Sequence, residues 1–231
     1  MVVTVDGPAG SGKSTIARRV ATRLGFTYLD TGAMYRAVTL AALEKGVPLG
    51  DGPELGRLAS RLQLRLDDAG PAPSGESQSR VFLGPRDVSL EVRSPEVTAA
   101  VSEVSAHAAV RSAMTELQRR LAGRGQTVME GRDTGTVVWP EAEVKVFLTA
   151  SPEERARRRL LQLKARGLTA EQEQVKREML RRDAWDSGRE VAPLRKAEDA
   201  VEIDTSHLTI EQVVERVVVL VKEAKAKGGA V

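Results

Sequence analysis

The stretch TVDGPAGSGKST, residues 4–15, decides the fold of this chain, because it has the sequence of a phosphate-binding loop between a strand and a helix. Its letters fit the pattern G-x-x-x-x-G-K-[ST], which begins at Gly7 and ends at Ser14. Glycines let the backbone turn its N–H groups toward an anion, and the helix that follows adds the positive end of its dipole. Lys13 is a point charge for the terminal phosphates, and the Ser14 hydroxyl is a magnesium ligand. The loop therefore predicts binding of a nucleoside triphosphate with magnesium.

The sequence on either side of the loop has the periodicity that this motif requires. The valines of residues 2–5 are typical of a buried parallel strand. Ile16, Val20 and Leu24 recur at helical spacing, and Gly25 stands where a helix would end. A glycine-rich turn without a ligand is the alternative interpretation, and the order of strand, loop and helix argues against it.

The composition is that of a globular protein and excludes several kinds of site. A length of 231 residues suits one α/β domain with insertions. The formal net charge of +3 gives no large cationic field, so we expect no nucleic-acid partner. Cysteine is absent, which excludes disulfides, thiol nucleophiles and cysteine metal sites.

We expect neither secretion nor a membrane partner. Gly7 comes too early for a signal peptide to precede the loop. The most hydrophobic late stretch, residues 213–221, carries Glu215 and Arg216 and is too short to span a bilayer. These features predict a cytoplasmic protein, and we expect it to be a monomer.

Strands and helices alternate over most of the chain. The last helix is predicted to open at Thr209, where Gln212 completes a capping box. This alternation indicates an α/β fold, a doubly wound parallel sheet whose ligands gather at the carboxyl ends of the strands. Further strands are predicted at residues 26–29, 127–129, 144–148 and 201–203.

One region departs from this alternation. Residues 62–66 alternate leucine with polar residues, and residues 81–83 and 88–92 again have strand periodicity. We expect these three strands to form a small antiparallel β insert over residues 61–95, after which helical periodicity runs from residue 97 to residue 121. The predicted division is a P-loop core of residues 1–60 and 96–231, the insert, and a short helical lid within the core at residues 153–170.

Three charged clusters follow predicted strands, where a site of this fold is expected. Arg36 lies about one helical turn past a strand and is predicted to hold a second phosphate, with a solvated arginine as the alternative. Glu130 ends a strand, where a ligand of the magnesium shell would lie opposite Ser14. The third cluster is equally well explained as a salt-bridged surface. The members of the clusters are Asp30, Thr31 and Arg36; Glu130, Arg132 and Asp133; and Arg182, Asp183, Asp186 and Arg189.

A further arginine-rich stretch, SPEERARRRLLQLKARG, presents one face of a helix. Arg155, Arg158 and Arg159 have the spacing i, i+3, i+4, which places them side by side on that face. One interpretation is a solvated surface. The other is a mobile lid that closes positive charge over a phosphoryl group in transfer.

The chain offers no obvious general base. His107 and His207 lie in no motif, and we expect each to be structural or exposed. A kinase that acts on a hydroxyl group needs a positioned base, whereas a phosphate acceptor is already ionised. Many arginines without a base therefore favour a phosphate as the acceptor.

Five blocks of sequence occur in a fixed order, DGPAGSGKST, LDTGAMYRA, GRDTGTVVWP, SPEERARRR and RDAWDSGREVAPL. Together they resemble the bacterial cytidylate kinases, a family of P-loop nucleoside monophosphate kinases. The resemblance covers essentially the whole chain, including the insert that marks the bacterial type. It implies transfer of a phosphoryl group from ATP to CMP or dCMP, with Mg²⁺ as the cofactor.

The resemblance also implies a role for each matching residue. The ATP phosphates would bind Gly7, Pro8, Ala9, Gly10, Ser11, Gly12, Lys13, Ser14 and Thr15, together with Arg158 of the lid. Thr31, Arg36, Arg132 and Arg189 would bind the CMP phosphate. The cytosine edge would contact Ser102, Arg111 and Asp133, and the ribose would contact Arg182 and Asp186. The catalytic set would be Lys13, Arg132, Asp133, Arg155, Arg159 and Arg189, and the magnesium ligands Ser14 and Glu130.

The base-reading set is chemically sound, and two other positions depart from the family pattern. Cytosine offers an exocyclic amine for a carboxylate and ring acceptors for an arginine. Thr31 stands where many relatives have serine, which keeps the hydroxyl. Glu130 stands where aspartate is expected, so a contact with the magnesium shell would be one methylene longer.

Three alternatives are less consistent with the sequence. Another P-loop nucleoside monophosphate kinase, of the UMP/CMP or adenylate type, usually lacks the insert at residues 61–95. A P-loop GTPase needs an N/T-K-x-D motif, which does not occur here. A non-catalytic P-loop nucleotide-binding protein could dispense with the arginine clusters that this chain keeps.

Overall fold

The computed structural model describes residues 1–67, 79–165 and 167–228. It divides into two compact units, Met1–Phe26 with Thr127–Val231, and Thr27–Gln126. The second unit contains the predicted insert at residues 61–95 and extends beyond it on both sides. The part of that insert at residues 68–78 lies outside the described residues, as does residue 166 of the predicted lid.

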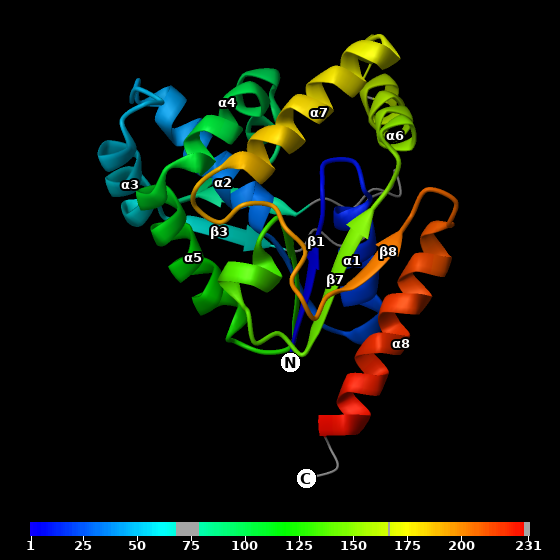
Figure 1. Ribbon diagram of the computed structural model, residues 1–231. Helices are drawn as coiled ribbons and strands as arrows, with labels where there is room; N and C mark the ends of the chain where they lie inside the picture. Colours follow the sequence, from blue (N-terminus) through cyan, green and yellow to red (C-terminus); the bar gives the residue numbers. More distant parts are fainter. Residues whose placement is uncertain (68–78, 166, 229–231) are drawn as a thin grey trace. The chain divides into compact units, whose positions relative to one another are not determined.

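A parallel sheet of five strands has the order β2-β6-β1-β7-β8, which confirms the doubly wound α/β fold (Figure 1). The central strand β1 pairs in parallel with β6 and β7, and β7 pairs in parallel with β8. The strands are β1 (Val2–Asp6), β2 (Thr27–Asp30), β6 (Thr127–Gly131), β7 (Val144–Thr149) and β8 (Val201–Asp204).

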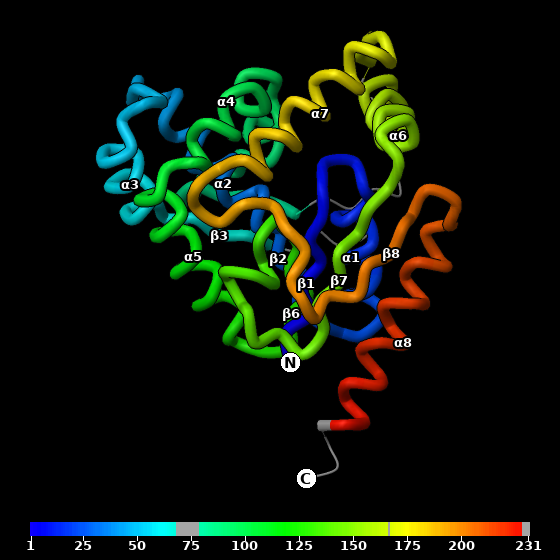
Figure 2. Tube along the Cα trace, in the orientation of Figure 1, coloured from blue at the N-terminus to red at the C-terminus, as the bar shows by residue number. Residues whose placement is uncertain are grey.

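The phosphate loop leaves the buried end of β1 and enters helix α1 (Lys13–Leu24), as Figure 2 shows. All five residues of β1 are buried, because a central strand of a parallel sheet is covered on both faces. Gly25 ends α1 in the left-handed conformation, at φ 69°. The predicted strand, loop and helix are therefore confirmed.

Three more helices complete the first unit. Helix α8 (Ile210–Gly228) packs beside α1, and it opens with the predicted capping box, since Thr209 and Gln212 exchange hydrogen bonds of 2.8 and 3.2 Å. Helices α6 (Pro152–Ala165) and α7 (Gln172–Gly188) form a pair in the region of the predicted lid. Their shared apolar cluster consists of Ala156, Val175 and Met179, with Ala9 of the phosphate loop packed against it.

The second unit combines helices with a small antiparallel sheet of order β3-β4-β5, which was predicted for the insert. Val81, Val88 and Val92 join Ala33 and Ala37 in its core. The elements that follow β2 are α2 (Thr31–Glu44), α3 (Gly52–Arg61), β3 (Leu64–Asp67), β4 (Arg80–Leu83), β5 (Arg86–Asp87), the 3₁₀ turn η1 (Glu91–Arg93), α4 (Pro95–Ala106) and α5 (Ala108–Ala122).

One predicted element of the second unit was wrong. Residues 88–92 are not a strand, because β5 ends at Asp87 and the chain turns through η1, with Leu90 85% exposed between buried valines. The helical periodicity predicted over residues 97–121 is confirmed and belongs to two helices, α4 and α5. They are interrupted at His107, whose backbone is extended at ψ 126° and whose Nε2 lies 2.7 Å from the Leu49 carbonyl oxygen.

No helix within the described ranges is long and apolar enough to cross a membrane.

Two glycines with positive φ should respond differently to substitution by alanine. At Gly7 (φ 146°) a Cβ would clash with the backbone carbonyl of Leu148, whereas at Gly25 (φ 69°) it would meet no atom within 4 Å. We expect Gly25→Ala to cost about 1 kcal/mol of unfolding free energy and Gly7→Ala about 3 kcal/mol or more. Urea unfolding of both variants measures the difference, and equal losses would contradict the close approach at Gly7.

Candidate active site

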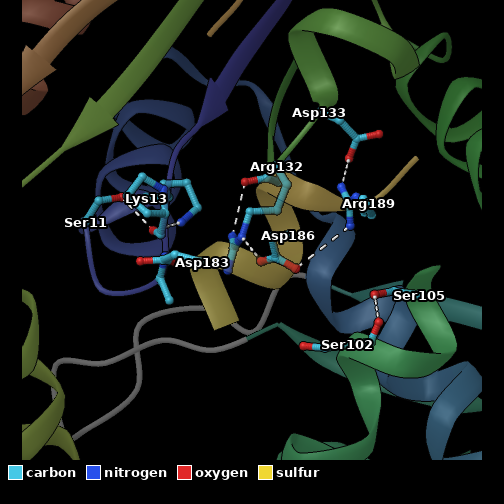
Figure 3. Close-up of polar contacts among 12 residues, drawn as sticks. Ser11, Lys13, Ser102, Ser105, Arg132, Asp133, Asp183, Asp186 and Arg189 are labelled. Carbon is cyan, nitrogen blue, oxygen red and sulfur yellow. Dashed lines mark hydrogen bonds and ion pairs between the residues drawn. The ribbon is translucent and has the colours of Figure 1, made fainter. Parts of the chain in front are cut away.

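Lys13 lies buried inside the phosphate loop, with 5% of its surface exposed. Its Nζ donates a 2.7 Å hydrogen bond to the Pro8 carbonyl, which also accepts from the Ser11 hydroxyl at 3.0 Å (Figure 3). Burial first, and then the charge of Arg132, lower the pKa of Lys13 to about 7. The loop thus holds a buried cation in place for an anionic ligand.

The Ala9 peptide of the loop is held on both sides by the helix pair α6–α7. Its N–H donates to Asp183 Oδ1 at 3.1 Å, and its carbonyl accepts from Arg155 Nη1 at 3.1 Å. Arg155 and Asp183 also form an ion pair with each other, and Arg155 Nε donates to the Ala150 carbonyl at 3.1 Å. The predicted lid arginine Arg155 is therefore buried and bound to protein groups in this structure.

Two further ion pairs lie in the same unit, between the end of β6 and the end of α7 (Figure 3). Arg132 Nε donates to Asp186 Oδ2 at 3.0 Å, and Arg189 Nη2 lies 3.4 Å from Asp133 Oδ1. Burial alone would lower the pKa of Arg132, but the charge of Asp186 and the hydrogen bond to it raise it. The fold thus brings together residues that lie more than 50 positions apart in the sequence.

Arg189 is positioned by the irregular segment that follows α7. Ala192 has a left-handed backbone at φ 53°, and its carbonyl accepts a 2.6 Å hydrogen bond from Arg189 Nε. The Leu194 N–H donates to the Asp186 carbonyl at 2.8 Å and closes the turn. This packing leaves the side chain of Arg189 only 6% exposed.

Arg182 belongs to the same cluster and is the member with a buried unsatisfied donor. Its Nε has no hydrogen-bond partner among the described residues. Burial first, and then the charge of Arg132, lower the pKa of Arg182 to about 10. An anionic or hydroxyl-bearing ligand would satisfy this donor.

The other two arginines of the predicted lid differ in their surroundings. Arg158 donates to the Thr205 hydroxyl at 2.9 Å and the Thr205 carbonyl at 2.7 Å, and the Thr205 hydroxyl in turn contacts the Ser11 carbonyl at 3.1 Å. Arg158 is thereby linked to the phosphate loop. Arg159 is half-buried, with Nη1 3.5 Å from the Gln162 side chain, and its charge contributes to lowering the pKa of Arg182.

The second unit carries the remaining predicted residues, in two groups. In the first, Arg36 Nη1 donates to the Thr98 hydroxyl at 2.9 Å and to the Val92 carbonyl at 3.3 Å. Thr31 is buried at the start of α2, whose N-terminus is capped by Asp30 through the Ala33 N–H at 2.8 Å.

The second group centres on Arg111, which is 3% exposed. Its guanidinium lies over the Tyr35 ring, 5.2 Å from the centroid, and donates to the Ser105 carbonyl at 3.2 Å. Ser105 in turn donates to the Ser102 carbonyl at 3.2 Å (Figure 3). The two predicted base-reading residues Ser102 and Arg111 therefore both contact Ser105.

The predicted magnesium ligands are an exposed hydroxyl and a buried carboxylate. Ser14 is exposed in the first turn of α1, and Glu130 is 4% exposed in β6. Glu130 is close enough to Lys13 for its charge to oppose the fall in the pKa of Lys13. No group of three histidine or acidic side chains gathers as a metal site in the described part of the chain. One or two protein oxygens suit Mg²⁺, which usually keeps several waters and binds substrate phosphates.

Two residues that contact the loop or its neighbours were missed in the sequence. Thr205 links Arg158 to the loop, and Asp6, the last residue of β1, accepts three hydrogen bonds from Thr134 and Gly135. Neither belongs to a spacing pattern. The sequence signal for Asp6 was only a carboxylate at the end of a buried strand.

The first unit therefore carries a buried lysine and several arginines, three of which face a carboxylate: Arg155 with Asp183, Arg132 with Asp186 and Arg189 with Asp133. Fixed cations beside a loop of backbone amides are suited to binding phosphate groups and to stabilising charge during phosphoryl transfer. The two histidines are structural or exposed, as predicted: His107 contacts the Leu49 carbonyl, and His207 is exposed.

The sequence matches a family described as cytidylate kinase over residues 3–223. A cytidylate kinase from Exiguobacterium sibiricum is 52% identical over 96% of this chain and 97% of its own length. A cytidylate kinase from Carboxydothermus hydrogenoformans is 50% identical over 96% and 97% of the two chains.

A solved structure of an uncharacterized protein from Eubacterium ventriosum has a TM-score of 0.51 over 96% of this chain and 98% of that chain, at 8% identity. That likeness concerns the fold alone. The sequence match to the cytidylate kinases is much stronger evidence, because it spans nearly the whole chain and includes all five sequence blocks that carry the resemblance. The chain belongs to the cytidylate kinase family.

Proposed function

We propose that this protein transfers the γ-phosphoryl group of ATP to the phosphate of CMP or dCMP. An oxygen of the acceptor phosphate forms a bond to the γ-phosphorus, the bond from that phosphorus to the β–γ bridging oxygen breaks, and the products are ADP and the cytidine diphosphate. The observation that carries the proposal is the group of Lys13, Arg132 and Arg182, which lie so close together that the charge of Arg132 lowers the pKa of both Lys13 and Arg182. Such crowding of cations is unfavourable without an anion between them.

The lack of a general base supports a phosphate as the acceptor. An ionised phosphate oxygen is already a nucleophile, so positioning and charge stabilisation supply most of the catalysis. The surroundings of the two histidines agree with this interpretation, because His107 contacts the Leu49 carbonyl and His207 is exposed.

The proposed roles in the first unit follow the charges of the side chains. Lys13 and the backbone amides of the loop bind the ATP phosphates, and Arg158 contributes through its link to the loop. Arg132 and Arg189 hold the acceptor phosphate, and Arg182 with Asp186 binds the ribose. The Asp133 carboxylate accepts a hydrogen bond from the cytosine amine. Arg155 and Arg159 belong to the lid, where Arg155 positions the loop through Ala9.

The proposed roles in the second unit are to hold phosphate and to read the base. Arg36 and Thr31 bind the CMP phosphate. Ser102 and Arg111 contact the cytosine edge, and the stacking of Arg111 on Tyr35 fixes the plane of its guanidinium.

Mg²⁺ is the proposed cofactor, with Ser14 and Glu130 as the protein groups nearest to it. When bound, the ion would neutralise charge on the ATP phosphates. We further propose that the enzyme works as a cytoplasmic monomer.

The proposed activity can be tested with a coupled ADP-release assay against CMP, dCMP, UMP, AMP and shikimate. We expect the highest kcat/KM for CMP or dCMP. A preference for AMP, UMP or shikimate would contradict the assignment, and shikimate serves as the control for a hydroxyl acceptor.

Lys13→Met should nearly abolish activity and stabilise the free protein. Loss of a charge that acts in the transition state lowers kcat by about 10²-fold or more. Because the pKa of Lys13 falls from 10.5 to about 7 on folding, the charged lysine destabilises the folded state fully below about pH 7. This penalty disappears as the pH rises toward 10.5, since the lysine is then neutral in the folded protein and becomes neutral in the unfolded chain as well.

Urea unfolding at about pH 6.5 and about pH 9.5 measures this effect, and the stability gain of Lys13→Met should be larger at the lower pH. Lys222→Met is the control, because Lys222 is exposed on α8. A variant that is less stable than the wild type at both pH values would contradict the burial of Lys13 as a charged group.

Asp133→Ala and Arg36→Ala should separate base reading from phosphate binding. UMP carries a carbonyl where CMP carries an amine. The Asp133 carboxylate would then face this carbonyl, and two hydrogen-bond acceptors that face each other in a buried site cost about 1–3 kcal/mol. Asp133→Ala should therefore lower kcat/KM for CMP and narrow the CMP-to-UMP ratio. Arg36→Ala should lower both values and leave the ratio nearly unchanged. A shift of the ratio in Arg36→Ala alone would show that the roles are assigned wrongly.

A further inference from the structure

Asp6 is the last residue of β1, directly before the phosphate loop, and its carboxylate is 4% exposed. Oδ1 accepts hydrogen bonds from the Thr134 N–H at 3.0 Å and the Thr134 hydroxyl at 2.8 Å. Oδ2 accepts from the Gly135 N–H at 2.7 Å. Burial raises the pKa of Asp6, and these three bonds oppose that rise. Both oxygens of the Asp6 carboxylate thus accept hydrogen bonds from the turn that follows β6.

That turn, η2 (Thr134–Val138), is a single π-helical turn whose first amides need acceptors. By position its N-cap is Asp133, at φ −143°, yet the Asp133 side chain makes no cap hydrogen bond. It lies instead 3.4 Å from Arg189 (Figure 3). Aspartate is among the preferred N-cap residues, so its absence from this role has a structural cause.

The cause is the close approach of η2 to β1. A Cβ at Gly135 would lie 2.8 Å from the Thr4 hydroxyl oxygen and 3.4 Å from Asp6 Oδ2, so only glycine allows the turn to sit this near the strand. At this distance the first two amides of the turn face Asp6 rather than Asp133. A residue from a different strand, 128 positions away in the sequence, supplies the cap.

We propose that Asp6 is a positioning residue for Asp133: it caps η2 from β1, so that the Asp133 carboxylate does not cap its own turn but stays beside Arg189, where it reads the base. The inference rests on the proposed role of Asp133 in cytosine recognition. Without Asp6 the amides of η2 are buried and unsatisfied, and Asp133 is the carboxylate that the sequence places at the cap. In the absence of Asp6, the Asp133 carboxylate then accepts hydrogen bonds from the amides of η2 and no longer pairs with Arg189.

The test compares Asp6→Asn with the wild type in steady-state kinetics for CMP, UMP and ATP. Asparagine keeps the size of the side chain but replaces the acceptor that faces the Gly135 N–H with a donor. We expect the CMP-to-UMP ratio of kcat/KM to fall about tenfold, mainly through KM for CMP, with KM for ATP changed less than about twofold. Equal losses for CMP and UMP would overturn the proposal, because they would indicate a structural role alone.

Asp51→Asn is the matched control. Asp51 caps α3 by accepting from the Glu54 N–H at 2.9 Å, and no site residue is proposed on that helix. It should leave the CMP-to-UMP ratio unchanged. A shift equal to that of Asp6→Asn would show that loss of any cap has this effect, and would overturn the proposal.

A double variant tests whether Asp6 acts through Asp133. In the Asp133→Ala background, Asp6→Asn should change the CMP-to-UMP ratio by less than about twofold, because the residue that it positions is gone. A full additional effect in that background would overturn the proposal. If Asp133→Ala narrows the ratio and Asp6→Asn does not, the inference fails while the proposed function stands.

Two substitutions at Thr134 keep the test decisive if the Asp6 variants do not fold. Thr134→Val removes one of the three hydrogen bonds to Asp6, and we expect the CMP-to-UMP ratio to fall about threefold. Thr134→Ser retains the hydroxyl and should keep the wild-type ratio. An unchanged ratio in Thr134→Val would overturn the proposal.

A crystal structure of the free Asp6→Asn or Thr134→Val variant gives a readout that does not depend on the role of Asp133 in the reaction. We expect the Asp133 carboxylate on the amides of its own turn. An Asp133 that still pairs with Arg189 in Asp6→Asn would overturn the inference. If instead Asp133 moves but Asp133→Ala leaves the CMP-to-UMP ratio intact, the positioning role holds and the proposed base-reading role fails.

Discussion

A buried lysine that must remain available to an anion is the constraint on which the rest of the first unit depends. Lys13 has little access to water, and its ammonium group donates a hydrogen bond to the Pro8 carbonyl. A full ion pair would satisfy the ammonium group but would also compete with a phosphate. A neutral carbonyl holds the side chain without neutralising it, while burial and the charge of Arg132 keep the pKa of Lys13 low.

The loop around Lys13 has to be equally well ordered before any ligand binds, because preorganised donors are more effective than mobile ones. The structure achieves this through the backbone: Asp183 and Arg155 hold the Ala9 peptide, and Thr205 contacts the Ser11 carbonyl. Carboxylates of the first unit hold their partners in fixed positions in the same way. Asp6 and Asp183 accept hydrogen bonds from main-chain N–H groups, and Asp183, Asp186 and Asp133 each pair with an arginine.

The elements that the sequence predicted correctly are those with a strong local signal. β1 is a run of apolar residues, the glycines of the loop have a fixed spacing, and the last helix opens with a capping box that the structure contains. The error arose where one periodicity fits two structures. Residues 88–92 place valines four apart, which a strand buries on one face and a tight turn through η1 buries equally well. The break at His107 has no local signal, because it depends on a contact with Leu49.

The sequence by itself determined the α/β class, the phosphate loop, the arginine clusters and the family, because each of these depends on residue identity at short, fixed spacing. Only the tertiary structure decided which carboxylate pairs with which arginine, that Arg155 binds the loop, and that Asp6 rather than Asp133 caps the turn after β6. The physical reason is that a side chain takes the nearest partner in space. For buried charges and amides, that partner comes from another strand or helix, at a separation that no sequence pattern records.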